Sequence, residues 1–295
     1  MKLEDAVEGY LLFKASRASP ETIRTDKSCL GQFTDWIGNV EADCVTSDDV
    51  QRYLAHHRQR GLSPHTVKRH HAILAALYAW LSSPDVDLAD GNPVRSVPPP
   101  KPPKLKPKAL SRRQIDALLE AADRANAKRR AKALLLFLLD TGARASEVCG
   151  VRLPDVDFRS GKVKVRGKGD KERFTYLGRR ALSALWLYVR EERPEPTRVR
   201  DDHLFLTVDG YPMTRHALRG AIVRLANAAG IRATTHQFRH TAAIEHLRNG
   251  MDLVSLQHLL GHTSITTTRK YLTALQDEDV EARAKRTSPT NNWRL

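Results

Sequence analysis

A proline-rich segment restricts the folding of this 295-residue chain more than any other feature. Residues 91–110, GNPVRSVPPPKPPKLKPKAL, contain seven of the fifteen prolines and no acidic residue. Proline removes a backbone donor and fixes φ, so the segment favours an extended and semi-rigid conformation. Because about twenty residues without secondary structure are unusual inside a compact domain, we expect a basic linker at 91–109 between domains at 1–90 and 110–295.

The region before the linker carries the signals of helix starts and ends and shows no strand pattern. Ser19 and Ser63 each precede a proline, which places an N-cap before a residue suited to the first helical position. Gly38 and Gly61 stand where helices would end. The signals therefore predict an all-helical domain of four or five helices, two of them at 3–14 and 48–60.

This helical region also carries two sets of polar side chains. Five basic residues are available to a phosphate backbone, although each alone is expected to be an ordinary solvated side chain: Arg24, Lys27, Arg52, Lys68 and Arg69. Five histidines cluster in the sequence without a cysteine among them: His56, His57, His65, His70 and His71. We predict that these histidines form a surface set on helices and not a metal site.

The region after the linker combines helices with one short hairpin. Ser111 and Gln114 have the spacing of a capping box, and an apolar helix is expected at 128–139. KVKVR alternates with period two, RFTYL is rich in strand formers, and GKGD between them is a turn signal, so Lys168 is expected at a hairpin tip. Further helix boundaries, and a last helix over TTTRKYL, are expected here: N-caps at Thr235 and Asp252, and a stop at Gly261. The predicted fold is mainly α with a small antiparallel β-sheet.

The charge of the chain points to a polyanionic partner. Lysine and arginine together number 49 against 34 acidic residues, which gives a net charge of +15 and a pI near 10.0. Nucleic acid is the first candidate, and a merely soluble basic protein is the alternative. The three cysteines form no C-x-x-C pair and imply no disulfide framework, so a reducing, cytoplasmic setting is expected. No signal peptide is expected, and the longest apolar run, ALLLFLL, is too short for a membrane span.

The stretch TTHQFRH, residues 234–240, places His236, Arg239 and His240 at offsets that share one face of a helix. Zinc peptidases also use His-x-x-x-His, but they need glutamate beside the first histidine as a general base, and Gln237 stands there. Arginine offers a permanently charged fork of donors that matches phosphate oxygens, and imidazole donates hydrogen bonds or moves protons near neutral pH. The pattern favours a phosphate site over a metal site, with an exposed basic helix as the remaining alternative.

Four segments occur in a fixed order in the C-terminal region: TGARASEV at 141–148, GKGDKER at 167–173, HQFRHT at 236–241 and LLGHTSITTTRKYL at 259–272. Together they resemble the active-site motifs of the tyrosine recombinase, or phage integrase, family. No single segment is decisive, but four in this order and spacing are highly specific. The N-terminal region resembles the family only in general character, as a helical core-binding domain.

This resemblance implies a catalytic set. Its members are, in chain order, Arg144, Lys168, His236, Arg239, His262 and Tyr271. The two arginines would clamp the scissile phosphate, the two histidines would hydrogen-bond it and assist proton movement, the lysine would protonate the leaving 5′ oxygen, and the tyrosine would attack phosphorus. A 3′-phosphotyrosine conserves the energy of the broken bond, so no ATP, cofactor or metal is expected. His240 and Glu147 are expected to support their neighbours, while Thr267 and Thr268 are expected to cap or pack helices.

The choice of Tyr271 as nucleophile also has support from the residues alone. Tyr176, Tyr188 and Tyr211 are expected to serve packing, whereas Tyr271 lies in a polar segment where burial does not explain an aromatic ring. Many relatives have leucine at the position of Phe238 and a histidine two residues after the tyrosine, where this chain has Thr273; no catalytic role is assigned to either.

The resemblance further implies a site-specific DNA recombinase that holds duplex DNA between its two domains and acts as a homo-tetramer, or a hetero-tetramer with a paralogue. The length and the simple architecture look Xer-like, which suggests resolution of replicon dimers, with mobile-element integration as a second possibility. A nucleoid-associated location is expected. The segment 276–287 is expected to form a short polar helix that packs onto a neighbouring protomer. The alternatives are a type IB topoisomerase-like enzyme and an inactive DNA-binding protein.

Overall fold

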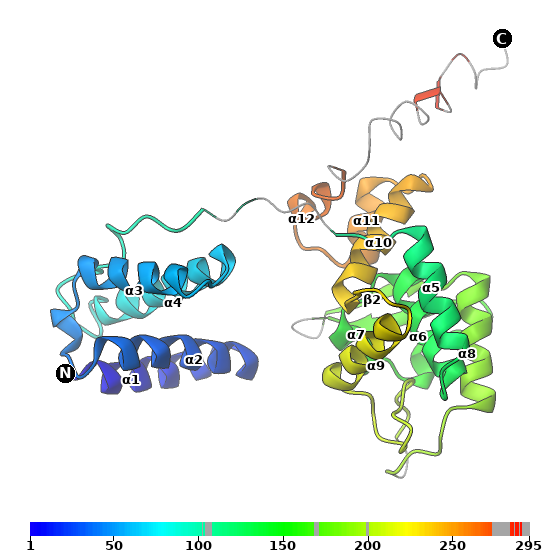
Figure 1. Ribbon diagram of the computed structural model, residues 1–295, viewed down its shortest axis with the longest axis horizontal. Helices are drawn as coiled ribbons and strands as arrows, with labels where there is room; N and C mark the ends of the chain where they lie inside the picture. Colours follow the sequence, from blue (N-terminus) through cyan, green and yellow to red (C-terminus); the bar gives the residue numbers. More distant parts are fainter. Residues whose placement is uncertain are drawn as a thin grey trace. The chain divides into compact units, whose positions relative to one another are not determined.

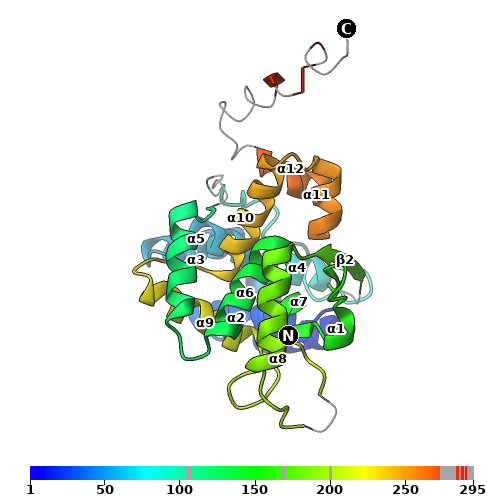
Figure 2. The same cartoon turned by 90° about the vertical axis from the view of Figure 1, so that its right-hand side faces the viewer.

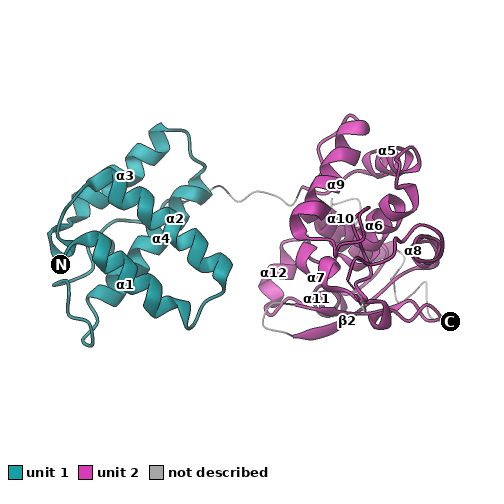
Figure 3. Ribbon diagram, turned by 90° about the horizontal axis from the view of Figure 1, so that it is seen from below, with its two compact units in different colours: residues 1–105 teal, residues 106–295 magenta. Residues whose placement is uncertain are grey.

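The structure, a computed structural model, describes residues 1–101, 103, 108–167, 171–198 and 201–272, together with 284, 285, 287, 288 and 290. The chain divides into two compact units, Met1–Leu105 and Lys106–Leu295 (Figure 3). Each unit has its own apolar core. In the described part of the chain, no helix combines the length and the apolar character needed to cross a membrane.

The described residues of the first unit form four α-helices and one 3-10 turn at Ala42–Cys44. The helices are α1 Leu3–Ala15, α2 Pro20–Ile37, α3 Ser47–Gln59 and α4 Pro64–Leu81 (Figure 1). The predicted caps of α2 and α4 are confirmed, because Ser19 and Ser63 accept the backbone N–H groups three residues later. Gly38 and Gly61 have φ values of 82° and 77°, a left-handed conformation that glycine adopts without a steric cost. The helical character predicted for this region is therefore confirmed.

Two of the five histidines predicted to form a surface set are not on the surface, while His56, His65 and His71 are at least partly exposed. His57 and His70 are almost fully buried, and their rings pack against Tyr53, one of the largest buried side chains. The prediction was wrong for these two because α3 and α4 face each other, and each turns one histidine inward onto the same aromatic ring. The proline-rich segment begins on this core as well, since Val94 and Val97 are buried in it.

The second unit contains eight α-helices and one hairpin among its described residues. The helices are α5 Arg112–Asp123, α6 Lys128–Thr141, α7 Ala145–Gly150, α8 Arg179–Glu191, α9 Arg215–Ala228, α10 Thr235–Arg248, α11 Leu253–Leu260 and α12 Ile265–Arg269. The capping box of Ser111 and Gln114 at the start of α5 is confirmed. Helix α6, which holds the longest apolar run, packs against α5, α8 and α10 at the centre of the unit (Figure 2).

The two predicted strands pair as an antiparallel hairpin, β1 Lys162–Arg166 with β2 Glu172–Tyr176. Val163 and Val165 are buried, while Phe174 on the opposite face is half exposed. A shift of one residue would turn the valines into solvent, so their burial fixes the register. Lys168, predicted for the tip of this hairpin, lies outside the described residues.

Four helix boundaries near the predicted site can be compared with the sequence analysis. The N-cap of α10 is Thr234, whose hydroxyl accepts the N–H of Gln237, and not Thr235 as predicted. The caps at Asp252 and Gly261 are confirmed. Helix α12 ends before the tyrosine of TTTRKYL, so Tyr271 lies on the turn that follows it.

Candidate active site

Arg239 lies at the centre of the predicted site residues. It extends from α10 and is only 3% exposed. Its guanidinium donates to the carbonyl oxygens of Gly142 and Leu260, each at 2.7 Å, and lies 2.9 Å from Nε2 of His262. Burial, together with the nearby charge of Arg144, lowers the pKa of Arg239 to about 10, so it stays protonated at neutral pH. The arginine is thus a fixed, charged donor that ties three segments together.

Gly142 makes this position of the arginine possible. It ends α6 with a φ of 55°, and a Cβ atom there would lie 2.7 Å from the side chain of Leu260. Only a residue without a side chain allows α6 to end this close to α11 while its carbonyl faces Arg239. The glycine of the TGAR segment therefore positions the arginine of the HQFRH segment.

Arg144 is held by a buried carboxylate. Glu147 accepts from both the backbone N–H and the Nη1 of Arg144, each at 2.8 Å, and from Nη2 of Arg173 on β2 at 2.7 Å. Arg173 also donates to the carbonyl of Leu259. Because Glu147 is almost fully buried, its charge acts on both arginines through a medium that screens it weakly. Arg144 remains exposed, with one terminal nitrogen of its guanidinium on Glu147 and the other 3.4 Å from the carbonyl oxygen of Gly261.

His262 has partners for both ring nitrogens. Nε2 lies beside Arg239, and Nδ1 lies 2.9 Å from the hydroxyl of the buried Thr268. Since a guanidinium only donates, Nε2 must accept and Nδ1 must carry the proton toward Thr268. Burial, followed by the charges of Arg239 and Arg144, lowers the pKa of His262 to about 4. Arg239 therefore fixes the tautomer of this histidine, and Thr268, which is buried as a packing residue would be, also accepts the Nδ1 proton.

Tyr271 is fully buried, which the sequence analysis did not predict. Its ring packs with Leu256, Leu260 and other apolar side chains of α10 and α11, and lies parallel to the ring of His262 at 6.3 Å. Its hydroxyl lies 3.1 Å from Nδ1 of His240. Burial raises the pKa of Tyr271, and the charge of Arg239 and a hydrogen bond with it work in the opposite direction.

The two histidines of α10 stand next to each other. The rings of His236 and His240 meet edge to face at 4.3 Å, and His236 is exposed. Burial lowers the pKa of His240 to about 4, and the charges of His236, Lys270 and Arg239 contribute to the shift. Among the described residues, these histidines belong to no group of three potential metal ligands. Helices α10, α11 and α12 bring the histidines, Arg239 and Tyr271 together on one side of the unit (Figure 1).

The other tyrosines considered as nucleophiles differ in their surroundings. Tyr188 is buried, and its hydroxyl accepts the N–H of Leu206, so the packing role predicted for it holds. Tyr176 and Tyr211 are more than half exposed, so packing does not explain them. Of the described tyrosines, Tyr271 is the one that interacts with Arg239.

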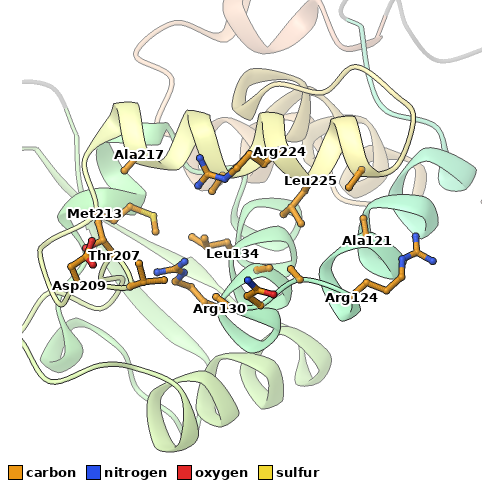
Figure 4. A pocket seen from close by; sticks show the side chains of 17 residues that line it. Ala121, Arg124, Arg130, Leu134, Thr207, Asp209, Met213, Ala217, Arg224 and Leu225 are labelled. Carbon is orange, nitrogen blue, oxygen red and sulfur yellow. The ribbon is translucent and has the colours of Figure 1, made fainter.

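The second unit also contains a cavity of about 600 Å³ between α5, α6 and α9 (Figure 4). Arg124, Arg130 and Arg224 stand around an apolar floor that includes Leu134 and Leu225. None of the described residues that line it belongs to the predicted catalytic set, so this cavity is separate from the site around Arg239.

Sequence reasoning missed two residues of the site. Arg173 was quoted only as part of a motif, and Thr268 was treated as a capping or packing residue. The sequence contained a weak indication for Arg173, because a charged residue in a strand of the predicted hairpin needs a partner of opposite charge if it is buried. Thr268 carried none, because its contact with His262 depends on the turn between α11 and α12.

Both units of the chain match known protein families, and curated relatives align along most of its length. Residues 108–278 match the phage integrase family, and residues 6–87 match the phage integrase N-terminal SAM-like domain. The tyrosine recombinase XerD of Listeria innocua is 31% identical to this chain, over 94% of the chain and 97% of the relative. The tyrosine recombinase XerC of Oceanobacillus iheyensis is 33% identical, over 91% of this chain and 90% of the relative.

Two solved structures are similar along nearly the whole chain. The XerA recombinase shares 28% identity with a TM-score of 0.55, over 97% of this chain and 98% of that one. The integrase of the transposon Tn1549, in complex with transposon right-end DNA, has a TM-score of 0.80 at 20% identity, over 98% of this chain and 100% of that one, a likeness of fold. The match across 108–278 and the relatives that align along nine tenths of the sequence lead to one conclusion: the chain belongs to the phage integrase family of tyrosine recombinases.

Proposed function

We propose that this recombinase cleaves and rejoins DNA at specific sites through a covalent 3′-phosphotyrosine on Tyr271. The observation that carries the proposal is the position of the Tyr271 hydroxyl, which lies beside the buried, charged Arg239 and against His240. A tyrosine that served packing alone would gain nothing from a cationic neighbour at its hydroxyl.

The arginines supply the charge that the reaction needs. A phosphodiester under attack accumulates negative charge on its non-bridging oxygens, and preorganised cationic donors stabilise it most strongly there. Arg239 is held by two carbonyls and Arg144 by Glu147, so neither has to be ordered when the phosphate enters. We propose that both bind the scissile phosphate, that His236 donates a hydrogen bond to it, and that His262 does so once the charge of the phosphate favours protonation of its Nε2.

Lys168 completes the proposed set as the general acid. The paired strands on either side of it end at Arg166 and Glu172, and Arg173 links the second strand to Glu147. Because Glu147 also holds Arg144, the second strand is tied to the arginine that would bind the phosphate. We therefore propose that Lys168 protonates the leaving 5′ oxygen, and that the residues at 91–109 link the DNA-binding unit to the catalytic one.

The assembly and the biological role extend this proposal. Two similar proteins have been solved in complex with DNA. They are the Tn1549 integrase with transposon right-end DNA and the XerH recombinase with its palindromic difH substrate. We propose that this chain acts likewise on duplex DNA, as a tetramer on paired sites within the cytoplasm. The XerC and XerD relatives support resolution of replicon dimers as its role, with mobile-element integration as the second candidate. The segment 276–287, of which the structure describes only residues 284, 285 and 287, is proposed to contact a neighbouring protomer.

The proposal can be tested with the DNA that the protein selects for itself. Genomic fragments from the source organism are incubated with the full chain, and protein-linked DNA is recovered under denaturing conditions and sequenced. A nicked duplex built on the recovered site then traps the intermediate, because the short cleaved strand diffuses away. We expect a denaturation-resistant adduct, attached through Tyr271 in peptide mapping, that forms equally well in EDTA. An adduct on another residue would overturn the assignment, and adduct formation that needs added Mg²⁺ or Zn²⁺ would overturn the arginine-based mechanism.

A further inference from the structure

We propose that His240 is a further catalytic residue, the group that accepts the proton of the Tyr271 hydroxyl during attack. The inference rests on the proposed function, in which this hydroxyl is the nucleophile. It starts from one contact: Nδ1 of His240 lies 3.1 Å from the hydroxyl oxygen of Tyr271. A general base has to lie within about 2.6–3.2 Å of the atom that loses the proton.

The neighbouring histidines are placed for other tasks. His262 uses Nε2 on Arg239 and Nδ1 on Thr268, so neither nitrogen is available to the tyrosine. His236 is exposed and meets the ring of His240 instead. Among the described histidines, His240 is the one with a ring nitrogen within hydrogen-bond distance of the Tyr271 hydroxyl.

The surroundings of His240 favour the neutral imidazole that a base requires. The charged or titratable groups that face it are His236 and Arg239 on α10, Lys270 after α12, and Tyr271 itself. Burial and the three cationic neighbours keep the pKa of His240 near 4 in the DNA-free protein. A bound phosphate adds negative charge next to Arg239 and raises this pKa toward neutrality, where a base is most effective.

The step balances without any further reactant. As the Tyr271 oxygen bonds to phosphorus, its proton passes to Nδ1 of His240, and the bond from phosphorus to the 5′ oxygen breaks. The 5′ oxygen takes a proton from the general acid proposed at Lys168. In the rejoining step a 5′ hydroxyl gives its proton back to the neutral amine proposed at Lys168 and attacks phosphorus, the tyrosine oxygen leaves, and the imidazolium of His240 returns the proton to it.

The decisive variant is His240→Asn. Asparagine places an oxygen close to the position of Nδ1, so it still accepts a hydrogen bond from the tyrosine but takes up no proton. We expect single-turnover adduct formation on the nicked duplex to slow by about 10²- to 10⁴-fold at neutral pH, the usual contribution of a general base. The rate of the variant should then rise steadily with pH, because hydroxide has to remove the proton. The matched control His216→Asn, on the exposed face of α9, should keep the wild-type rate and profile.

Two additional measurements separate proton transfer from positioning. Imidazole added to His240→Ala should restore part of the rate, with a dependence on the free-base concentration. In the wild-type chain labelled with ¹⁵N-histidine, His240 should carry its proton on Nε2, since Nδ1 has to accept; this measurement needs no variant to fold. A proton on Nδ1 at neutral pH, or a His240→Asn protein with the wild-type rate and pH profile, would overturn the inference. Loss of the adduct in Tyr271→Phe, tested in parallel, shows whether the underlying function still holds when the inference fails.

Discussion

Each unit of this protein buries a tyrosine whose hydroxyl meets Nδ1 of a histidine. In the first unit Tyr53 lies 2.9 Å from His70, and in the second Tyr271 lies 3.1 Å from His240. Both histidines have a pKa near 4, and in both cases burial is the main cause. The two pairs therefore look alike when only the tyrosine and the histidine are compared.

The pairs differ in what surrounds them. Burial raises the pKa of Tyr53 strongly, Cys29 adds to the rise, and the charge of Arg60 alone opposes it, whereas Tyr271 has two opposing arginines, one of which, Arg239, also hydrogen-bonds it. His57, next to Tyr53, has no hydrogen-bond partner at either ring nitrogen. A buried tyrosine–histidine pair is thus a packing element by default, and converging arginines are what make one a candidate for chemistry.

The sharpest test of this comparison removes the two hydroxyl groups separately. Tyr271→Phe should abolish the covalent adduct, because no oxygen remains to attack phosphorus, while DNA affinity changes little. Tyr53→Phe should leave the rate of adduct formation unchanged and lower stability by about 1 kcal/mol, the usual net value of one hydrogen bond. Denaturing gels and urea unfolding measure the two effects. The comparison breaks down if Tyr53→Phe also slows the covalent step.

The second test addresses the arginine that distinguishes the two sites. Arg239→Lys keeps a positive charge but loses the fork that reaches Gly142 and Leu260. We expect adduct formation to slow by about 10²- to 10³-fold, as when one preorganised donor is removed from a transition-state site. Equal DNA affinity of the variant and the wild type, measured by fluorescence anisotropy, would assign the loss to the chemical step. A rate within a few-fold of wild type would show that charge alone is sufficient.

The third test uses acid. The folded-state pKa of His70 is near 4 and the ordinary value is 6.5, so the unfolded chain binds the proton first as pH falls. Stability of the first unit should therefore be complete above pH 6.5 and fall between pH 6.5 and 4, by at most about 3 kcal/mol for this residue. His70→Asn, which keeps an acceptor for Tyr53, should flatten the dependence. Hydrogen exchange of the full chain, followed by mass spectrometry, reports each unit separately.

DNA should separate the two units in the same acid experiment. A bound phosphate offers a counter-charge to His236, His240 and His262, so DNA should protect the second unit between pH 6.5 and 4. His57 and His70 are buried away from solvent in the first unit, so DNA should not remove their acid sensitivity. Equal protection of both units would mean that the histidines of the first unit also respond to the phosphate backbone.

The smallest expected effect concerns Thr268. Thr268→Val preserves the shape of the side chain and removes the hydroxyl next to Nδ1 of His262. The loss of one hydrogen bond, about 1 kcal/mol, should slow adduct formation about fivefold. The exposed neighbour provides the matched control, Thr267→Val, which should stay at the wild-type rate. An equal effect of both changes would indicate a general disturbance of α12.

Helix ends and the hairpin could be predicted from the sequence because their causes are local. Ser19, Ser63 and Ser111 each cap a helix by accepting the backbone N–H three residues later. The alternation of KVKVR likewise indicates which side chains of the strand are buried. The predicted site residues that the structure describes also lie in one unit, although their roles came from the resemblance. In contrast, the burial of Tyr271 depends on α10 and α11, which pack against a segment that is polar in sequence.

The same physical reason explains the other failures. His57 and His70 appear as members of a basic, polar stretch, and their burial follows only once α3 meets α4. The partnership of Arg173 with Glu147 joins residues 26 positions apart on different elements. Local periodicity carries no information about such contacts, so a sequence can indicate which residues matter without indicating how they touch.

The hairpin has a consequence for how this protein can change over evolutionary time. Buried Val163 and Val165 fix the pairing of its strands, and beyond the paired residues the N–H of Gly167 donates to the carbonyl of Lys171. An insertion inside either strand would invert the valines and damage the fold, so selection should remove it at once. An insertion between Gly167 and Lys171 would leave the strands paired and would change the length of the connection that contains Lys168. If Lys168 is the general acid proposed above, this connection is a place where lineages can gain or lose length and alter strand cleavage without endangering the scaffold. A deep insertion scan, scored separately for folding and for cleavage, would reveal it.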